Sequence, residues 1–172
     1  MSIVLDYGHG GRDVGASYKG RNESEDVERF GKMLAAALRK RGVTVHETRE
    51  GKAFVSLRAR VRYSNEKKPL YFISIHRNAS AKHRACGAET YIFPNSPARL
   101  LAQQLQDAMV ISGFSNRGVK QAAYYVLKHT EVPAILVEIG FIDCARDNAR
   151  FDEQMPVLTE RMACDIARAC NK

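Results

Sequence analysis

The chain has 172 residues, of which 45% are hydrophobic and 27% are charged, a balance typical of one folded globular domain. No apolar run approaches the roughly 18 residues of a membrane-spanning helix, so we expect no membrane span. Lysine and arginine number 27 against 19 acidic residues, and the net charge of +8 favours an anionic partner such as nucleic acid, anionic lipid or a wall polymer.

The N-terminal half predicts strands that alternate with helices. A glycine-rich loop follows the first apolar run, and apolar residues on one helical face predict the first helix, which ends before Gly42. Ser56 is a typical N-cap for the second helix. In chain order we expect a strand over 2–5, a loop over 8–20, a helix over 23–41, a strand over 43–45, a helix over 56–68 and a strand over 71–75.

The C-terminal half continues the alternation. We expect a strand over 89–93, a helix over 97–113, a short strand over 124–127, a strand over 134–137 and a last helix over 156–170. This order predicts an α/β fold, a twisted and mostly parallel sheet with helices on both faces. No linker or repeat interrupts the sequence, so we expect residues 1–172 to form a single domain.

The four cysteines, Cys86, Cys144, Cys164 and Cys170, contain no C-x-x-C pair, and a chain of this length does not need cross-links to fold. We therefore expect reduced thiols.

Polar residues follow three of the predicted strands. His9 comes after the first strand, His76 after the middle strand and Glu138 after the late strand. Because ligands bind in the crevice at the carboxyl ends of strands in open α/β sheets, these side chains meet at one edge if the strands are parallel neighbours. Glu23, at the start of the first helix, joins them if that helix begins on the same side.

Two histidines and one glutamate are a common ligand set for a catalytic zinc ion. His9 and His76 supply imidazole nitrogens, one carboxylate supplies an oxygen, and the other carboxylate accepts a proton from water. The alternative for each histidine is a purely structural hydrogen bond. His46, His83 and His129 end no buried strand, and we interpret them as surface residues.

The helical face favours Glu23 as the carboxylate ligand. It shares the apolar face of Val27 and Phe30, whereas Glu25 and Glu28 point to the polar side. Two alternatives stay open: Glu23 only complements the helix N-terminus, or Glu25 is the ligand.

Together these residues stand in segments that resemble the zinc-dependent N-acetylmuramoyl-L-alanine amidases of the amidase-3 group. The segments are VLDYGHGGRDVGA (4–16), FISIHRNA (72–79), GAETY (87–91), RGVK (117–120) and VPAILVEIGF (132–141). The resemblance covers nearly the whole chain. Two residues depart from the group's pattern, because Tyr7 stands where proline is usual and Arg77 where a small residue is usual.

The resemblance implies a phosphorylase/hydrolase-like fold and one Zn²⁺ ion held by His9, Glu23 and His76, with Glu138 as the catalytic residue. It implies hydrolysis of the amide bond between N-acetylmuramic acid and L-alanine in peptidoglycan, the bacterial wall polymer. We expect Arg117 and Asn78 to contact the substrate, although Arg117 also fits a solvated loop charge.

Two other functions fit part of the sequence. A nucleic-acid-binding domain would explain the charge but lacks a binding motif, and a non-catalytic wall-binding module would lack part of the four-residue set. We expect a monomer that consists of the catalytic domain alone, without a wall-binding domain. With no signal peptide visible, we expect synthesis in the cytoplasm and action on the wall, as in a phage endolysin or a bacterial autolysin.

Overall fold

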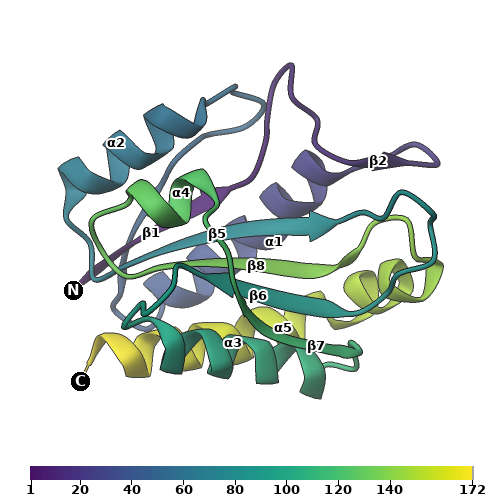
Figure 1. The fold of residues 1–172 in the computed structure, drawn as a ribbon. Coiled ribbons are helices and arrows are strands. Elements are labelled where there is room, and N and C mark those ends of the chain that lie inside the picture. The colour runs from purple at the N-terminus through teal and green to yellow at the C-terminus, as the bar shows by residue number, and fades with distance from the viewer. Residues whose placement is uncertain (172) are drawn as a thin grey trace.

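A six-stranded sheet forms the centre of the protein, with the strand order β4-β1-β5-β8-β6-β7 (Figure 1). The computed structural model describes residues 1–171. The strands are β1 (Ser2–Tyr7), β4 (Thr44–Glu47), β5 (Tyr71–Asn78), β6 (Ala88–Ile92), β7 (Asn116–Gln121) and β8 (Ala134–Phe141), and a separate small sheet pairs β2 (Ser17–Tyr18) with β3 (Arg21–Asn22). Strands β4, β1, β5 and β8 are parallel neighbours, whereas β6 is antiparallel to β8 and parallel to β7. The expected α/β fold with a mostly parallel sheet is confirmed.

Helices cover both faces of this sheet. They are α1 (Glu23–Arg39), α2 (Leu57–Lys67), α3 (Arg99–Ile111), α4 (Tyr125–His129) and α5 (Ala145–Cys170). The long helices α1, α3 and α5 lie on one face, and the shorter α2 and α4 lie on the other (Figure 1). The side chain of Ser56 accepts a hydrogen bond from the backbone N–H of Ala59, which confirms the predicted cap of α2.

The alternation of side chains along each strand divides the apolar residues between two cores. On β1, β5 and β8, odd-numbered residues such as Ile73 and Val137 belong to the large core under α1, α3 and α5. Even-numbered residues of the same strands, such as Phe72 and Leu136, belong to the small core under α2 and α4. Because side chains two residues apart share a face, His76 and Glu138 lie on the α2/α4 face of the sheet.

Three elements of the structure differ from the prediction. Residues 125–129 form the helix α4 instead of a strand, and β7 was not predicted because its sequence is polar and shows no alternation. The last helix begins at Ala145, so Pro156 lies inside it rather than at its start. Burial of Phe151 and Met155 against the large core extends the helix past the point where the proline indicates a beginning.

The cysteines are a further correction. Cys86 and Cys144 form a disulfide with a Cα–Cα distance of 5.7 Å, while Cys164 and Cys170 are free. The partners are 58 residues apart in sequence. They meet because the antiparallel β6 starts where β8 ends, a topology that the spacing of the cysteines cannot reveal.

No helix among residues 1–171 is long and apolar enough to cross a membrane.

Candidate active site

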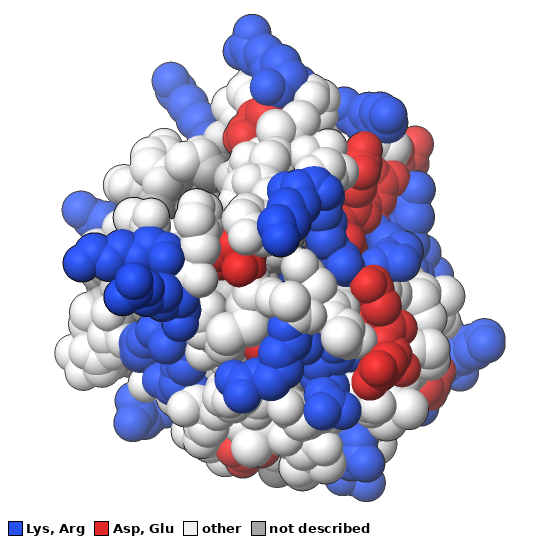
Figure 2. Space-filling view, turned by 90° about the vertical axis from the view of Figure 1, so that its right-hand side faces the viewer, with Lys and Arg blue, Asp and Glu red and all other residues white. Residues whose placement is uncertain are grey.

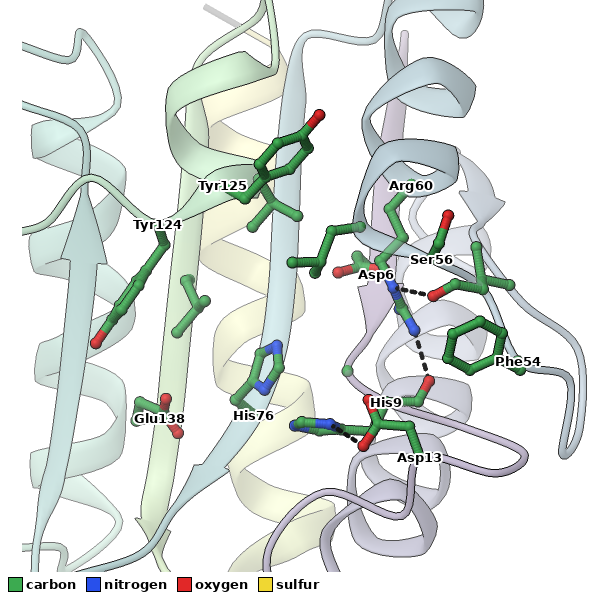
Figure 3. Close-up of a pocket in the computed structure, with 15 residues that line it drawn as sticks. Asp6, His9, Asp13, Phe54, Ser56, Arg60, His76, Tyr124, Tyr125 and Glu138 are labelled. Carbon is green, nitrogen blue, oxygen red and sulfur yellow. Dashed lines mark hydrogen bonds and ion pairs between the residues drawn. The ribbon is translucent and has the colours of Figure 1, made fainter.

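Three of the predicted site residues converge at the carboxyl ends of the parallel strands. One donor atom each from His9, Glu23 and His76 lies within 4.8 Å of the others. His9 follows β1, Glu23 opens α1 and His76 lies near the end of β5. Glu138 on β8 is the register partner of His76, so its carboxyl group lies beside the cluster. Figure 3 shows His9, His76 and Glu138 on the walls of one pocket.

The Glu23 carboxylate lies between the two imidazoles. Its Oε1 is 2.9 Å from Nδ1 of His76, and its Oε2 is 3.2 Å from Nε2 of His9. Although burial raises the pKa of Glu23, the contacts with His76 and His9 hold it well below its usual range. Glu25, the alternative ligand, is exposed on α1 and lies outside the cluster.

The surroundings of His9 fit a metal ligand. Its Nε2 faces Glu23, while its Nδ1 is 2.9 Å from the Asp13 carboxylate. Histidines that bind metals usually donate their second ring N–H to a carboxylate or carbonyl, which fixes the ring. Burial lowers the pKa of His76, but its contact with Glu23 raises the pKa more, to about 9. The site therefore favours positive charge between these donors. The donor set therefore suits a divalent cation such as zinc.

Two glycines of the loop make this close approach possible. A Cβ atom on Gly8 would lie 2.4 Å from the ring of His76, and one on Gly15 would lie 2.6 Å from Glu23 Oε2. Gly15 also has a φ of +69°, in the left-handed region that favours glycine. Any larger residue at either position would displace one of the candidate ligands.

Sequence reasoning missed two buried arginines that hold the loop. Arg60 of α2 donates to Asp6 at 2.6 Å and to the backbone carbonyls of Tyr7 and His9 at 2.6 and 2.5 Å. Arg49 donates to the carbonyls of Tyr7 and Ser24, which join the end of β1 to the start of α1. A polar residue within the apolar first strand, Asp6, was the available signal that a buried cation lies nearby.

Arg77 is a third buried arginine, next to His76 in sequence. Its backbone N–H donates to Glu23 Oε1 at 3.0 Å, and its guanidinium donates to Asp26 at 2.6 Å and to the carbonyl of Ile139 at 3.1 Å. The residue thus connects β5 with α1 and with β8.

Glu138 differs from Glu23 in having no strong partner. Its Oε2 atom is buried and has no hydrogen-bond partner among the described residues. The pKa of Glu138 is raised to about 8: burial raises it most, the neighbouring Glu23 and Glu89 add to the rise, and His76 and His9 oppose it. A carboxyl group with this pKa exchanges a proton near neutral pH, as a general base must.

Asn78 and Arg117, the two residues predicted to contact the substrate, are both bonded to the Glu89 carboxylate. Glu89 is the register partner of Glu138 on β6. Asn78 donates to Glu89 Oε1 at 2.5 Å, Arg117 donates to its Oε2 at 3.0 Å, and Lys120 also pairs with Oε2. Arg117 and Asn78 are thus close to the Glu138 carboxyl group but are partly engaged by another carboxylate.

The other histidines lie away from the site. His129 is exposed, His46 is half-buried at the end of β4, and His83 is largely exposed with Nδ1 2.8 Å from Asp143.

Comparison with known proteins identifies the family of the chain. Residues 3–172 match the amidase-3 family, described as N-acetylmuramoyl-L-alanine amidase. The chain belongs to this family. The solved structure of the N-acetylmuramoyl-L-alanine amidase AmiC2 of Nostoc punctiforme is 31% identical, covers 100% of this chain and 98% of its own, and superimposes with a TM-score of 0.92. An N-acetylmuramoyl-L-alanine amidase from Clostridium difficile 630 is 27% identical with a TM-score of 0.94, covering 99% of this chain and 97% of its own.

Curated relatives of this amidase-3 chain are longer proteins. The N-acetylmuramoyl-L-alanine amidase LytC of Bacillus subtilis is 33% identical over 88% of this chain and 32% of its own length. The probable cell wall amidase LytH of Staphylococcus aureus is 36% identical over 90% of this chain and 52% of its own. The chain thus spans about a third to a half of the relatives it matches.

Proposed function

We propose that this chain is a zinc-dependent peptidoglycan hydrolase that cleaves the amide bond between N-acetylmuramic acid and L-alanine of the stem peptide. Residues 1–172 form its catalytic domain. The observation that carries the proposal is the meeting of His9, Glu23 and His76 beside the unpaired carboxyl group of Glu138. Membership of the amidase-3 family supports this bond as the substrate.

The zinc ligands in this proposal are Nε2 of His9, Nδ1 of His76 and a carboxylate oxygen of Glu23. A zinc ion at such a site polarises a carbonyl group, makes water more acidic and stabilises negative charge in the transition state. Asp13 keeps the His9 ring in the tautomer whose Nε2 is free to bind.

Glu138 supplies the proton transfers. Its carboxylate accepts a proton from the attacking water and then donates that proton to the leaving nitrogen of L-alanine. The hydroxyl of the water becomes part of the lactyl carboxylic acid, and its proton becomes part of the new amino terminus of the peptide. The unpaired Oε2 is the natural acceptor, since no residue in the described part of the chain competes for it.

Digestion of purified peptidoglycan by the zinc-loaded protein tests the proposal. Mass spectrometry of the products should show glycan strands with free lactyl carboxylates and released peptides that begin with L-alanine. Cleavage between sugars or within the stem peptide would contradict it, as would intact wall after long incubation. Since one of the relatives is named a probable cell wall amidase, we infer that this protein also acts on the cell wall.

A further inference from the structure

An exposed apolar surface borders the candidate active site. It consists of Phe54, from the segment that leads into α2, Leu57, the first residue of α2, and Tyr124 and Tyr125 at the start of α4. We call these four residues the apolar wall. Their exposed fractions are 43%, 55%, 44% and 40%. All four line the same pocket as His9, His76 and Glu138, and Figure 3 shows Tyr124 and Tyr125 above the catalytic groups and Phe54 beside Asp13. Clustered exposed hydrophobic residues are a common mark of a binding site.

The topology of the sheet explains the pocket. Leu136 lies two residues before Glu138 on β8, so both side chains point to the α2/α4 face. The helices on that face are short, 11 residues in α2 and 5 in α4, and they leave part of the sheet uncovered between them. The resulting cavity has a volume of about 490 Å³. This is within the usual range for a small-molecule site and large enough for a sugar residue.

The charged groups of this pocket are already paired with each other. Arg60 and Asp6 form a buried ion pair at 2.6 Å, and Asp13 contacts His9. Outside the catalytic groups, the pocket therefore offers apolar faces and hydroxyl groups to a ligand.

The opposite flank of Glu138 has a different character. There Arg117 and Lys120 both approach the single carboxylate of Glu89, so two cations face one anion. Tyr124 lies next to this cationic flank, because its ring centroid is 5.1 Å from that of Tyr91, whose hydroxyl donates to Glu89. Phe54 and Tyr125 lie on the other side of the Glu138 carboxyl group, toward β5 and β1 (Figure 3).

We propose that the apolar wall binds the sugar ring of N-acetylmuramic acid and that the stem peptide extends toward Arg117 and Lys120. This assignment rests on the proposed function. Once its lactyl carboxyl group is part of the scissile amide, the sugar residue is neutral, and its C–H faces pack well on aromatic rings. The stem peptide carries free carboxylates, which the cationic flank attracts. The distribution of charge thus fixes the orientation of the substrate, with the sugar on the apolar wall and the peptide at the cationic flank.

Two substrates with the same peptide test the assignment. One carries N-acetylmuramic acid, and the other carries only lactate on the L-alanine nitrogen. The kcat/KM for the N-acetylmuramic acid substrate divided by that for the lactate substrate measures what the sugar contributes. We expect Leu57→Ser and Tyr125→Ser each to lower this ratio by about 5- to 10-fold, the effect of losing a modest apolar contact. Leu100→Ser on α3 is the matched control, because Leu100 is 64% exposed and lies outside the pocket; its ratio should match the wild type.

A binding measurement keeps the assignment testable without turnover. N-acetylmuramic acid with its lactyl carboxyl group capped as a methylamide, titrated into the labelled protein, should shift the amide resonances of residues 124–126 in NMR spectra, and Tyr125→Ser should weaken this binding. An unchanged ratio in both wall variants, or a ratio that responds to Arg117→Ala instead, would overturn the assignment. If the wild type cleaves neither substrate, the proposed activity fails, and the sugar titration then decides the subsite by itself: absence of shifts at 124–126 rejects it.

Discussion

At the scale of single residues, the two glutamates of the candidate site have opposite environments. Glu23 is held by two histidines and by backbone N–H groups of Ala16 and Arg77, which stabilise its ionised form. Glu138 is buried without such partners, and its pKa is raised to about 8. This difference supports our proposal that Glu23 is a charged metal ligand and that Glu138 transfers protons.

Substitution of Glu138 should separate chemistry from binding. We expect Glu138→Gln to bind zinc and fold like the wild type, because the amide has nearly the same shape, while its turnover falls by about 10²–10⁴-fold since the amide cannot accept a proton. Turnover on muropeptide, with zinc content measured by elemental analysis, checks this. Loss of zinc in this variant would show instead that Glu138 is a ligand.

The choice between Glu23 and Glu25 has a direct test. We expect Glu23→Gln to weaken zinc binding strongly and Glu25→Gln to leave it unchanged, because only the Glu23 carboxylate faces both imidazoles while Glu25 is exposed. Zinc affinity, measured by competition with a chelator, gives the answer. Weaker binding in Glu25→Gln alone would contradict the assignment.

At the scale of elements, buried arginines connect segments that the sheet alone does not join. Arg77 is fully buried and reaches Asp26 on α1 and the carbonyl of Ile139 on β8, so it links the elements that carry Glu23, His76 and Glu138. We expect Arg77→Met to lower the free energy of unfolding by about 2–4 kcal/mol, because buried polar partners lose their donor.

Arg29 provides the matched control for Arg77. It also approaches Asp26, at 3.5 Å, but its side chain is 52% exposed. Arg29→Met should change stability by less than about 1 kcal/mol, since exposed ion pairs contribute little. Urea unfolding of both variants measures the difference. Equal effects of the two substitutions would show that burial of Arg77 adds nothing to the free energy of unfolding.

The disulfide is a second connection between elements. It joins the loop before β6 to the start of α5, between two cysteines 58 positions apart, and encloses β6, α3, β7, α4 and β8. We expect Cys86→Ser to lower the free energy of unfolding by about 2–4 kcal/mol, because the unfolded chain regains conformational freedom. Reductant should destabilise the wild type by the same amount and should leave Cys86→Ser unaffected. Cys164→Ser, at a free cysteine, is the control.

The elements that the sequence predicted well have strong local signals. The first helix, the cap at Ser56 and the apolar strands were predicted because periodicity and capping are local. β7 was missed because its sequence is polar and shows no alternation, and the disulfide was missed because it depends on β6 running antiparallel to β8. The His9, Glu23 and His76 cluster was predicted from strand ends and helix faces, whereas Arg60 and Arg77 were not, because nothing local marks an arginine as buried.

At the scale of the whole molecule, the charge is spread rather than gathered. Figure 2 shows Lys and Arg side chains over much of the face at the carboxyl ends of the parallel strands, with Asp and Glu between them. The net charge is +8. Such a surface attracts an anionic polymer over a distance set by salt, about 8 Å at physiological ionic strength.

We therefore expect binding to purified wall, and its hydrolysis, to fall as salt rises, whereas cleavage of a small muropeptide whose peptide carboxylates are amidated, and which is therefore neutral, changes much less. The wall carries phosphate and carboxylate groups that a basic surface attracts from a distance, but a neutral substrate meets only the site itself. Measuring both activities from low salt to about 0.5 M separates the two contributions, since the screening length then shrinks to a few ångströms. An equal response of wall and muropeptide would show that the charge serves solubility and has no role in capturing the substrate.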